Sequence, residues 1–151
     1  MADADPALVQ RLQRWADGRA TLREVRGYSE EQLHAVARMG YFFYTQGKLE
    51  QARTLFQGLY AVDPTEVAYA RALAVLEMAA GNPQGALQAY EVALKVAPDD
   101  PASLVGRAEV RLAEGARQGA LDDLRRAVAR AEDGSPLQQK AAALLGALDG
   151  P

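Results

Sequence analysis

The stretch GYFFYTQGKLEQARTLFQGLYAVDP, residues 40–64, decides the fold, because its key residues recur 34 positions later in AVLEMAAGNPQGALQAYEVALKVAP, residues 74–98. A third, weaker copy follows. The equivalent residues are a turn glycine (Gly47, Gly81, Gly115), a small residue (Ala52, Ala86, Ala120), a large residue (Phe56, Tyr90, Leu124) and, in two copies, a proline (Pro64, Pro98). A constant period over three copies indicates a protein built of stacked repeats.

The period and the residue pattern are those of the tetratricopeptide repeat, a helix–turn–helix unit with the signature W-x2-L-G-x2-Y…A-x3-F…P. Residues 33–66 form repeat 1, residues 67–100 repeat 2 and residues 101–134 repeat 3, with the match weakest in repeat 3. We therefore predict an all-α tetratricopeptide-repeat superhelix of three helix-turn-helix repeats with flanking N- and C-terminal helices. We expect it to form a single domain over residues 1–151.

The signature residues have physical roles in such a fold. Gly40, Ala74 and Ala108 are small, so the first helix of each repeat can approach the second closely. Glycine in the turn between the two helices tolerates the left-handed conformation that ends a helix. Pro64 and Pro98 lie beyond the second helix, where continuing the helix would cost about 3 kcal/mol.

The flanking segments also have helix signals. An N-terminal helical region is expected over residues 5–32, beginning at Pro6, with possible capping boxes at Thr21…Glu24 and Ser29…Gln32. Ser135 followed by Pro136 begins a capping helix over residues 135–148. A final helix is expected because the end of a repeat stack must be covered.

The composition argues against several functional classes. The nearly balanced net charge of −3 argues against nucleic-acid binding, which needs a clustered basic surface, and the absence of cysteine removes thiolate metal sites. No apolar run approaches the roughly 20 residues that span a bilayer, and the N-terminus lacks the order of a signal peptide, so we expect a cytoplasmic protein.

His34 is the one histidine and lacks a metal-ligand partner at helical spacing, and the motifs of common enzyme classes are missing. We expect a protein that is not an enzyme and uses no cofactor or metal.

Acidic pairs are interpreted as surface features, and the basic stretch Arg125, Arg126 and Arg130 near a helix end as stabilising the helix dipole. In the pairs Asp99–Asp100 and Asp122–Asp123, adjacent helical residues point apart, so solvated caps and faces explain them better than a paired acid site.

A peptide-binding groove is expected on the concave side of the stack, which the first helix of each repeat lines. The predicted groove residues are His34, Ala37, Tyr41 and Tyr44 in repeat 1, Ala68, Arg71, Val75 and Met78 in repeat 2, and Val105, Glu109 and Leu112 in repeat 3. Most are apolar or aromatic, which suits an extended segment with hydrophobic side chains. Tyrosine adds a large contact area and a hydroxyl for the ligand backbone.

Two alternatives concern this groove: a different kind of ligand, and a different position for its two tyrosines. Ala37 and Tyr41 stand where a clamp for a C-terminal carboxylate would need lysine and asparagine, so an acidic chain terminus is disfavoured as ligand. Tyr41 and Tyr44 share a helix face, and either could pack on a flanking helix instead of lining the groove. Phe43 is at a signature position and is predicted to lie in the core.

Residues 18–64 also resemble the class II chaperones of bacterial type III secretion, the LcrH/SycD family, and the likeness extends over roughly residues 8–131. The shared elements, in order, are Thr21–Leu22, Ser29–Glu31–Leu33, the aromatic run Tyr41–Tyr44, Gln46–Gly47–Lys48–Ala52, Phe56–Gln57–Leu59 and Asp63–Pro64. The chain departs from the family at Ala35–Val36, where a Leu-Tyr pair is frequent, at Tyr69, Leu73 and Ala74 in repeat 2, and in repeat 3, which lacks the usual aromatic and cysteine residues.

The resemblance implies a chaperone that binds an extended segment of hydrophobic translocator or effector proteins in its concave groove and keeps them soluble and secretion-competent. It also implies a possible transcription activator as a further partner, and a homodimer formed through the N-terminal helix. Leu8, Leu12 and Trp15 are the candidates for that dimer contact. The alternative function is a general tetratricopeptide-repeat adaptor that scaffolds another complex.

Overall fold

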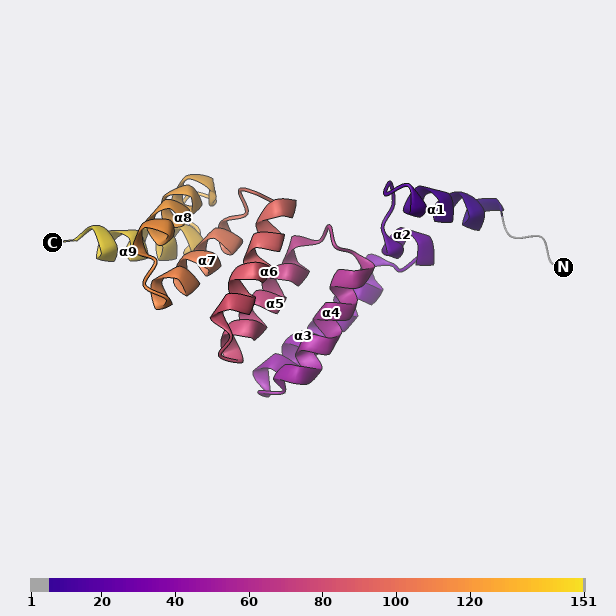
Figure 1. The fold of residues 1–151 in the computed structure, drawn as a ribbon, viewed down its shortest axis with the longest axis horizontal. Helices are drawn as coiled ribbons and strands as arrows, with labels where there is room; N and C mark the ends of the chain where they lie inside the picture. Colours follow the sequence, from indigo (N-terminus) through magenta and orange to yellow (C-terminus); the bar gives the residue numbers. More distant parts are fainter. Residues whose placement is uncertain (1–5, 151) are drawn as a thin grey trace. The chain divides into compact units, whose positions relative to one another are not determined.

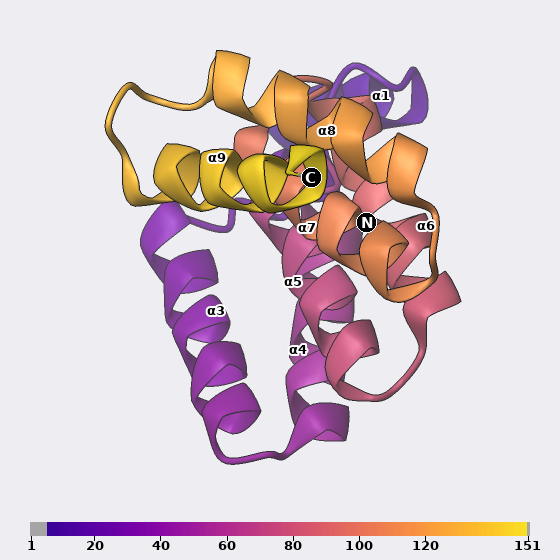
Figure 2. The ribbon, with the colours of Figure 1, turned by 90° about the vertical axis from the view of Figure 1, so that its left-hand side faces the viewer.

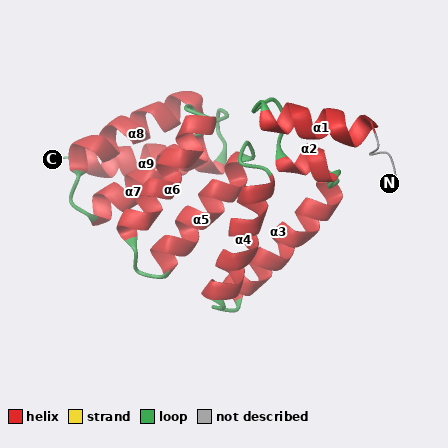
Figure 3. Cartoon of the chain, turned by 45° about the vertical axis from the view of Figure 1, so that its right-hand side comes forward, coloured by secondary structure: helices red, strands yellow, loops and turns green. Residues whose placement is uncertain are grey.

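The computed structural model describes residues 6–150, apart from the side chains of Leu8 and Leu12. Over that range the chain consists of helices and connecting loops, without a strand (Figure 3). The helices are α1 (Pro6–Ala16), α2 (Leu22–Arg26), α3 (Glu30–Thr45), α4 (Leu49–Val62), α5 (Val67–Ala79), α6 (Pro83–Val96), α7 (Pro101–Ala113), α8 (Arg117–Arg130) and α9 (Pro136–Asp149). The predicted all-α repeat fold is confirmed, with one helix pair for each repeat. None of the described helices is both long enough and apolar enough to cross a membrane.

The chain divides into two compact units, with the boundary between Tyr69 and Ala70, inside α5. The first unit contains α1 to α4 and the second contains the remainder of α5 together with α6 to α9. Figure 1 labels the helices along the chain.

The core of the first unit is the helix pair α3 and α4, which run side by side (Figure 2). Its buried residues include Leu33 of α3 and Ala52, Phe56 and Leu59 of α4, all at most 5% exposed. Gly40 makes the close approach possible, because a Cβ atom there would stand 2.6 Å from Cε2 of Phe56. α2 packs against α4, and α1 packs against α2.

Local signals set the ends of these helices as predicted. Both capping boxes form: the Ser29 hydroxyl accepts from the Gln32 N–H at 3.1 Å, and the Gln32 side chain accepts from the Ser29 N–H at 2.9 Å. Thr21 and Glu24 make the same reciprocal pair at the start of α2. The turn glycine Gly47 has a φ of +72°, the left-handed conformation that a residue with a Cβ rarely adopts.

The second unit has its core where α7, α8 and α9 meet, and Figure 2 shows α8 and α9 side by side. Its buried residues are Leu94, Leu104, Val105, Ala108, Ala120, Leu124, Ala127 and Ala141, with Leu112, Val128, Leu137, Leu144, Leu145 and Leu148 packed around them. Four leucines in the surrounding set come from α9. The predicted capping helix therefore covers the last repeat.

One sequence interpretation is wrong. Asp123 was expected on a solvated face, but it is 2% exposed and binds two arginines of α7. Its neighbour Asp122 is exposed, as expected. The arginines occupy two apolar positions of the repeat signature, so the usual side chains between α7 and α8 are replaced by an ionic cluster.

Candidate functional site

The exposed face of α3 carries three of the predicted groove residues. His34, Tyr41 and Tyr44 lie seven and three positions apart on one side of the helix, and all three are exposed. Ala37 lies between them in sequence but is only 9% exposed. Its small side chain leaves the tyrosines as the main contact area of this face.

Tyr41 both packs on the core and remains available to a ligand. Its ring meets the edge of the buried Phe56 ring at a centroid distance of 5.0 Å and an interplanar angle of 64°. The side chain is nevertheless 49% exposed, and Tyr44 is 38% exposed. An aromatic ring fixed from behind loses little conformational freedom on binding, which favours it as a contact residue.

Three further apolar side chains of α3 are partly or largely exposed, among them Phe43, which was predicted to lie in the core. Val36 and Met39 are 37% and 55% exposed, and Phe43 is half-buried with the Lys48 ammonium 5.9 Å above its ring. Val36 borders an apolar cavity of about 380 Å³ that also includes Leu33, Leu59 and Val62. In the second unit the equivalent residues of α7 are Leu104, which is buried, and Arg107 and Arg111, which bind Asp123 of α8.

The second unit presents its own apolar stripe on α5. Arg71, Val75 and Met78 follow one another at helical spacing, and the two apolar residues are 38% and 36% exposed. Arg71 Nη1 donates to Asp100 Oδ2 at 2.8 Å, and the same carboxylate accepts from the Ser103 N–H at 3.0 Å to cap α7. The guanidinium is therefore held in place beside the stripe. Ala68, the remaining predicted residue of this helix, is half-buried in the first unit.

The three residues predicted on α7 differ in their surroundings. Val105 is 2% exposed and belongs to the core of the second unit, and Leu112 packs half-buried against that core. Glu109 is exposed and forms an ion pair with Lys140 of α9, whose Nζ lies 2.6 Å from Oε1. This end of the second unit therefore offers an ion pair, where repeats 1 and 2 offer apolar side chains.

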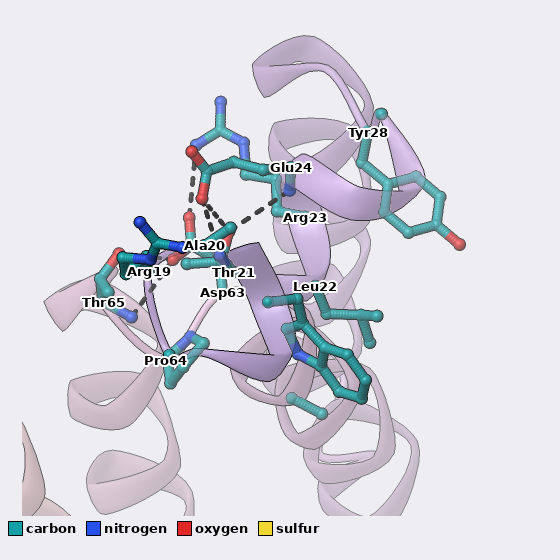
Figure 4. A pocket seen from close by; sticks show the side chains of 14 residues that line it. Arg19, Ala20, Thr21, Leu22, Arg23, Glu24, Tyr28, Asp63, Pro64 and Thr65 are labelled. Atoms are coloured by element: carbon teal, nitrogen blue, oxygen red, sulfur yellow. Dashed lines mark hydrogen bonds and ion pairs between the residues drawn. The ribbon is translucent and has the colours of Figure 1, made fainter. Parts of the chain in front are cut away.

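A cavity of about 870 Å³ lies where the loop between α1 and α2 meets the end of α4 (Figure 4). Its charged groups bind one another: Arg23 Nη1 lies 3.3 Å from Asp63 Oδ2, and the Asp63 carboxylate also accepts from Thr65. Trp15 lines the cavity and is 49% exposed. The side chains of Leu8 and Leu12, the other two dimer candidates, lie outside the described residues.

A family model described as "Tetratricopeptide repeat" matches residues 8–67 and 71–136. No curated protein sequence matches the chain. Among solved structures, the type III secretion translocator chaperone SycD of Yersinia enterocolitica superposes with a TM-score of 0.78 over 85% of this chain and 98% of that chain, at 22% identity, a likeness of fold.

Two further solved structures are closer in sequence. A type III secretion complex from Aeromonas hydrophila has 26% identity and a TM-score of 0.77 over 95% of both chains. PcrH of Pseudomonas aeruginosa has 28% identity and a TM-score of 0.73 over 81% of this chain and 95% of that chain. PcrH has also been solved in complex with the chaperone binding regions of PopD and of PopB.

Proposed function

The chain belongs to the tetratricopeptide repeat family, and we propose that it is a type III secretion chaperone that binds hydrophobic translocator proteins. The observation that carries the proposal is the likeness to PcrH, which reaches 29% identity in the PcrH complex with the chaperone binding region of PopB. That likeness extends over 81% of this chain and 98% of PcrH, so it is not confined to one repeat.

The exposed side chains support the same function. Tyr41 and Tyr44 on α3, and Val75 and Met78 on α5, present apolar and aromatic surface on each of the two units. When an extended client segment covers such surface, the free energy of binding gains about 25 cal/mol for each Å² of apolar area removed from water. The same burial lowers the tendency of a hydrophobic client to aggregate before export.

The chaperone works in the cytoplasm, binds the client without catalysing a reaction, and uses no cofactor and no nucleic acid. It forms a homodimer through its N-terminal helix, where the exposed Trp15 is the described contact candidate. A transcription activator is a possible second partner after the client leaves.

Co-expression tests the proposal against a general scaffolding role. The chain is produced together with each neighbouring gene product that contains hydrophobic segments, and the soluble fraction and the copurified protein are measured. A translocator chaperone should move at least one such client from the insoluble to the soluble fraction as a stable complex. Clients that stay insoluble in its presence would contradict the proposal and favour a general adaptor.

A further inference from the structure

The guanidinium group of Arg71 has one edge without a partner in the described part of the chain. Its Nη1 donates to Asp100 Oδ2 at 2.8 Å, and neither Nε nor Nη2 bonds to any residue within 6–150. Both of these nitrogens reach solvent, because neither is buried without a hydrogen bond and 31% of the side chain is exposed. The N–H groups on Nε and Nη2 lie side by side in the guanidinium plane, so two parallel donors remain open.

Asp100 fixes the guanidinium in place and shares its own charge with a helix end. It is the N-cap residue of α7, and its Oδ2 also accepts from the N–H and the hydroxyl of the buried Ser103. The positive end of the α7 dipole stabilises the same carboxylate. Because the negative charge of Asp100 is divided between α7 and Arg71, part of the positive charge of Arg71 stays uncompensated. A cation held in this way also loses little freedom when it binds a ligand.

Arg107 of the same chain shows what such an edge binds. Its Nε and Nη2 hold the two carboxylate oxygens of Asp123 at 2.9 and 2.8 Å. Two parallel N–H groups match the two oxygens of a carboxylate in spacing and direction, which a lysine ammonium cannot do. No acidic residue among those described occupies the equivalent edge of Arg71. A carboxylate from another molecule therefore fits it.

Apolar side chains continue the face of α5 that begins at Arg71. Val75 and Met78 lie four and seven positions further along the helix and are 38% and 36% exposed. A client segment that covers them excludes water, so an ion pair beside them is screened less than one on open surface. Glu109, the one acidic residue predicted on the binding surface, is bound to Lys140 and leaves the Arg71 edge free.

We propose that the Nε–Nη2 edge of Arg71 binds the carboxylate of an aspartate or glutamate side chain in the client segment, beside the hydrophobic residues that cover Val75 and Met78. This inference rests on the proposed function, because the ligand is the client of a translocator chaperone. It adds a requirement for selecting clients, an acidic residue at a fixed distance from apolar ones. Such a side chain lies within the segment and differs from the acidic chain terminus that repeat 1 disfavours.

Peptides test the carboxylate side of the pair. Overlapping synthetic peptides covering the translocator that copurifies with the chain are labelled with a fluorophore, and the tightest binder is titrated by fluorescence anisotropy. Each aspartate or glutamate of that peptide is then replaced by asparagine or glutamine, which keeps the shape and removes the charge. One of these replacements should weaken binding to the wild type roughly 3- to 30-fold, between the effects of an exposed ion pair and a bidentate one.

Two variants test the arginine side. Arg71→Met keeps the apolar stem and removes the charge, whereas Arg71→Lys keeps a cation for Asp100 and lacks the two parallel donors. The preference for the acidic peptide over its amide form should vanish in Arg71→Met and fall by more than half in Arg71→Lys. Arg125→Met removes the same charge from the exposed side of α8 and should retain the full preference. Thermal melting followed by circular dichroism checks that each variant is folded.

The deciding result is the coupling between the two sides. The acidic position that matters to the wild type should no longer matter to Arg71→Met, because the two changes remove one interaction. Should Arg71→Met fail to fold, Arg71→Lys gives the same comparison. Amide replacements without effect on the wild type, or with equal effects on the wild type and the Arg71 variants, would overturn the inference. If no peptide binds the wild type at all, the proposed function itself fails, and that result is distinct from a loss confined to Arg71.

Discussion

Arg107 holds Asp123 with two parallel hydrogen bonds, from Nε to Oδ2 at 2.9 Å and from Nη2 to Oδ1 at 2.8 Å. Arg111 adds a third from Nη1 to Oδ2 at 2.7 Å and also donates to the carbonyl of Gly119. The carboxylate is 2% exposed and joins α8 to two turns of α7. Repeat 3 therefore holds its two helices together with an ionic cluster where the signature calls for leucine and tyrosine.

Removing the carboxylate should destabilise repeat 3 strongly. Asp123→Ala leaves two guanidinium groups without their acceptor, one of them in a mostly buried position, and breaking such a cluster typically costs about 3–5 kcal/mol. Urea unfolding followed by far-ultraviolet circular dichroism would measure the loss. Asp122→Ala removes the exposed neighbour and should change the free energy of unfolding by less than about 0.5 kcal/mol. Equal effects of the two variants would show that the cluster contributes nothing.

Two glycines within helices should respond in opposite directions to the same substitution. Gly40→Ala places a methyl group 2.6 Å from the buried Phe56 ring, so overpacking should cost about 1–3 kcal/mol. Gly58 of α4 has no atom within 4 Å of an added Cβ, so Gly58→Ala should stabilise the chain by about 0.5–1 kcal/mol through helix propensity. Denaturation midpoints of the two variants compared with wild type provide the measurement. Stabilisation by Gly40→Ala would mean that the close approach of α3 and α4 is not required.

The sequence predicts the helices well because their signals are local or periodic. Thr21 and Ser29 begin helices through capping boxes formed within four residues, and Gly47 ends one by its left-handed conformation. The period of the repeat places each helix pair. These features can be predicted without knowing which side chains, distant in the sequence, are in contact in the folded chain.

The parts that the sequence does not predict depend on pairs distant in the chain. Asp123 belongs to an acidic pair that looks solvated until Arg107 and Arg111 are placed beside it. Tyr90 and Gly106 each fit a helix pattern, and only the folded pair shows that a Cβ atom at Gly106 would overlap the Tyr90 ring. Val105 has the spacing of a groove residue but lies in the core, in the buried cluster that also contains Ala141 of α9. Predicting such features requires knowing which residues of the neighbouring helix lie beside the residue in question.

Stability at high pH should depend on Tyr90. Burial raises its pKa from the ordinary value of 10.0 to about 12, so the folded state retains the proton after the unfolded state has lost it. The resulting stabilisation is complete below pH 10 and is lost as the pH rises towards 12, by an amount on the order of 2–3 kcal/mol. Tyr90→Phe should show a smaller loss of stability between pH 9 and about pH 11.5 than wild type. The same decline of stability in both proteins would contradict a raised pKa of Tyr90 in the folded state.

A charge on the exposed face of α3 should abolish client binding without unfolding the protein. Tyr44→Asp replaces a 38% exposed ring by a carboxylate, which an apolar client segment can cover only by removing its water without a partner. We expect unchanged helical content by circular dichroism and loss of the client in copurification. Gln57→Asp places the same charge on the exposed side of α4 and should retain the client. Because the two variants have the same added charge, retention of the client by Tyr44→Asp would remove Tyr44 from the binding surface, whereas loss from both would indicate a general charge effect.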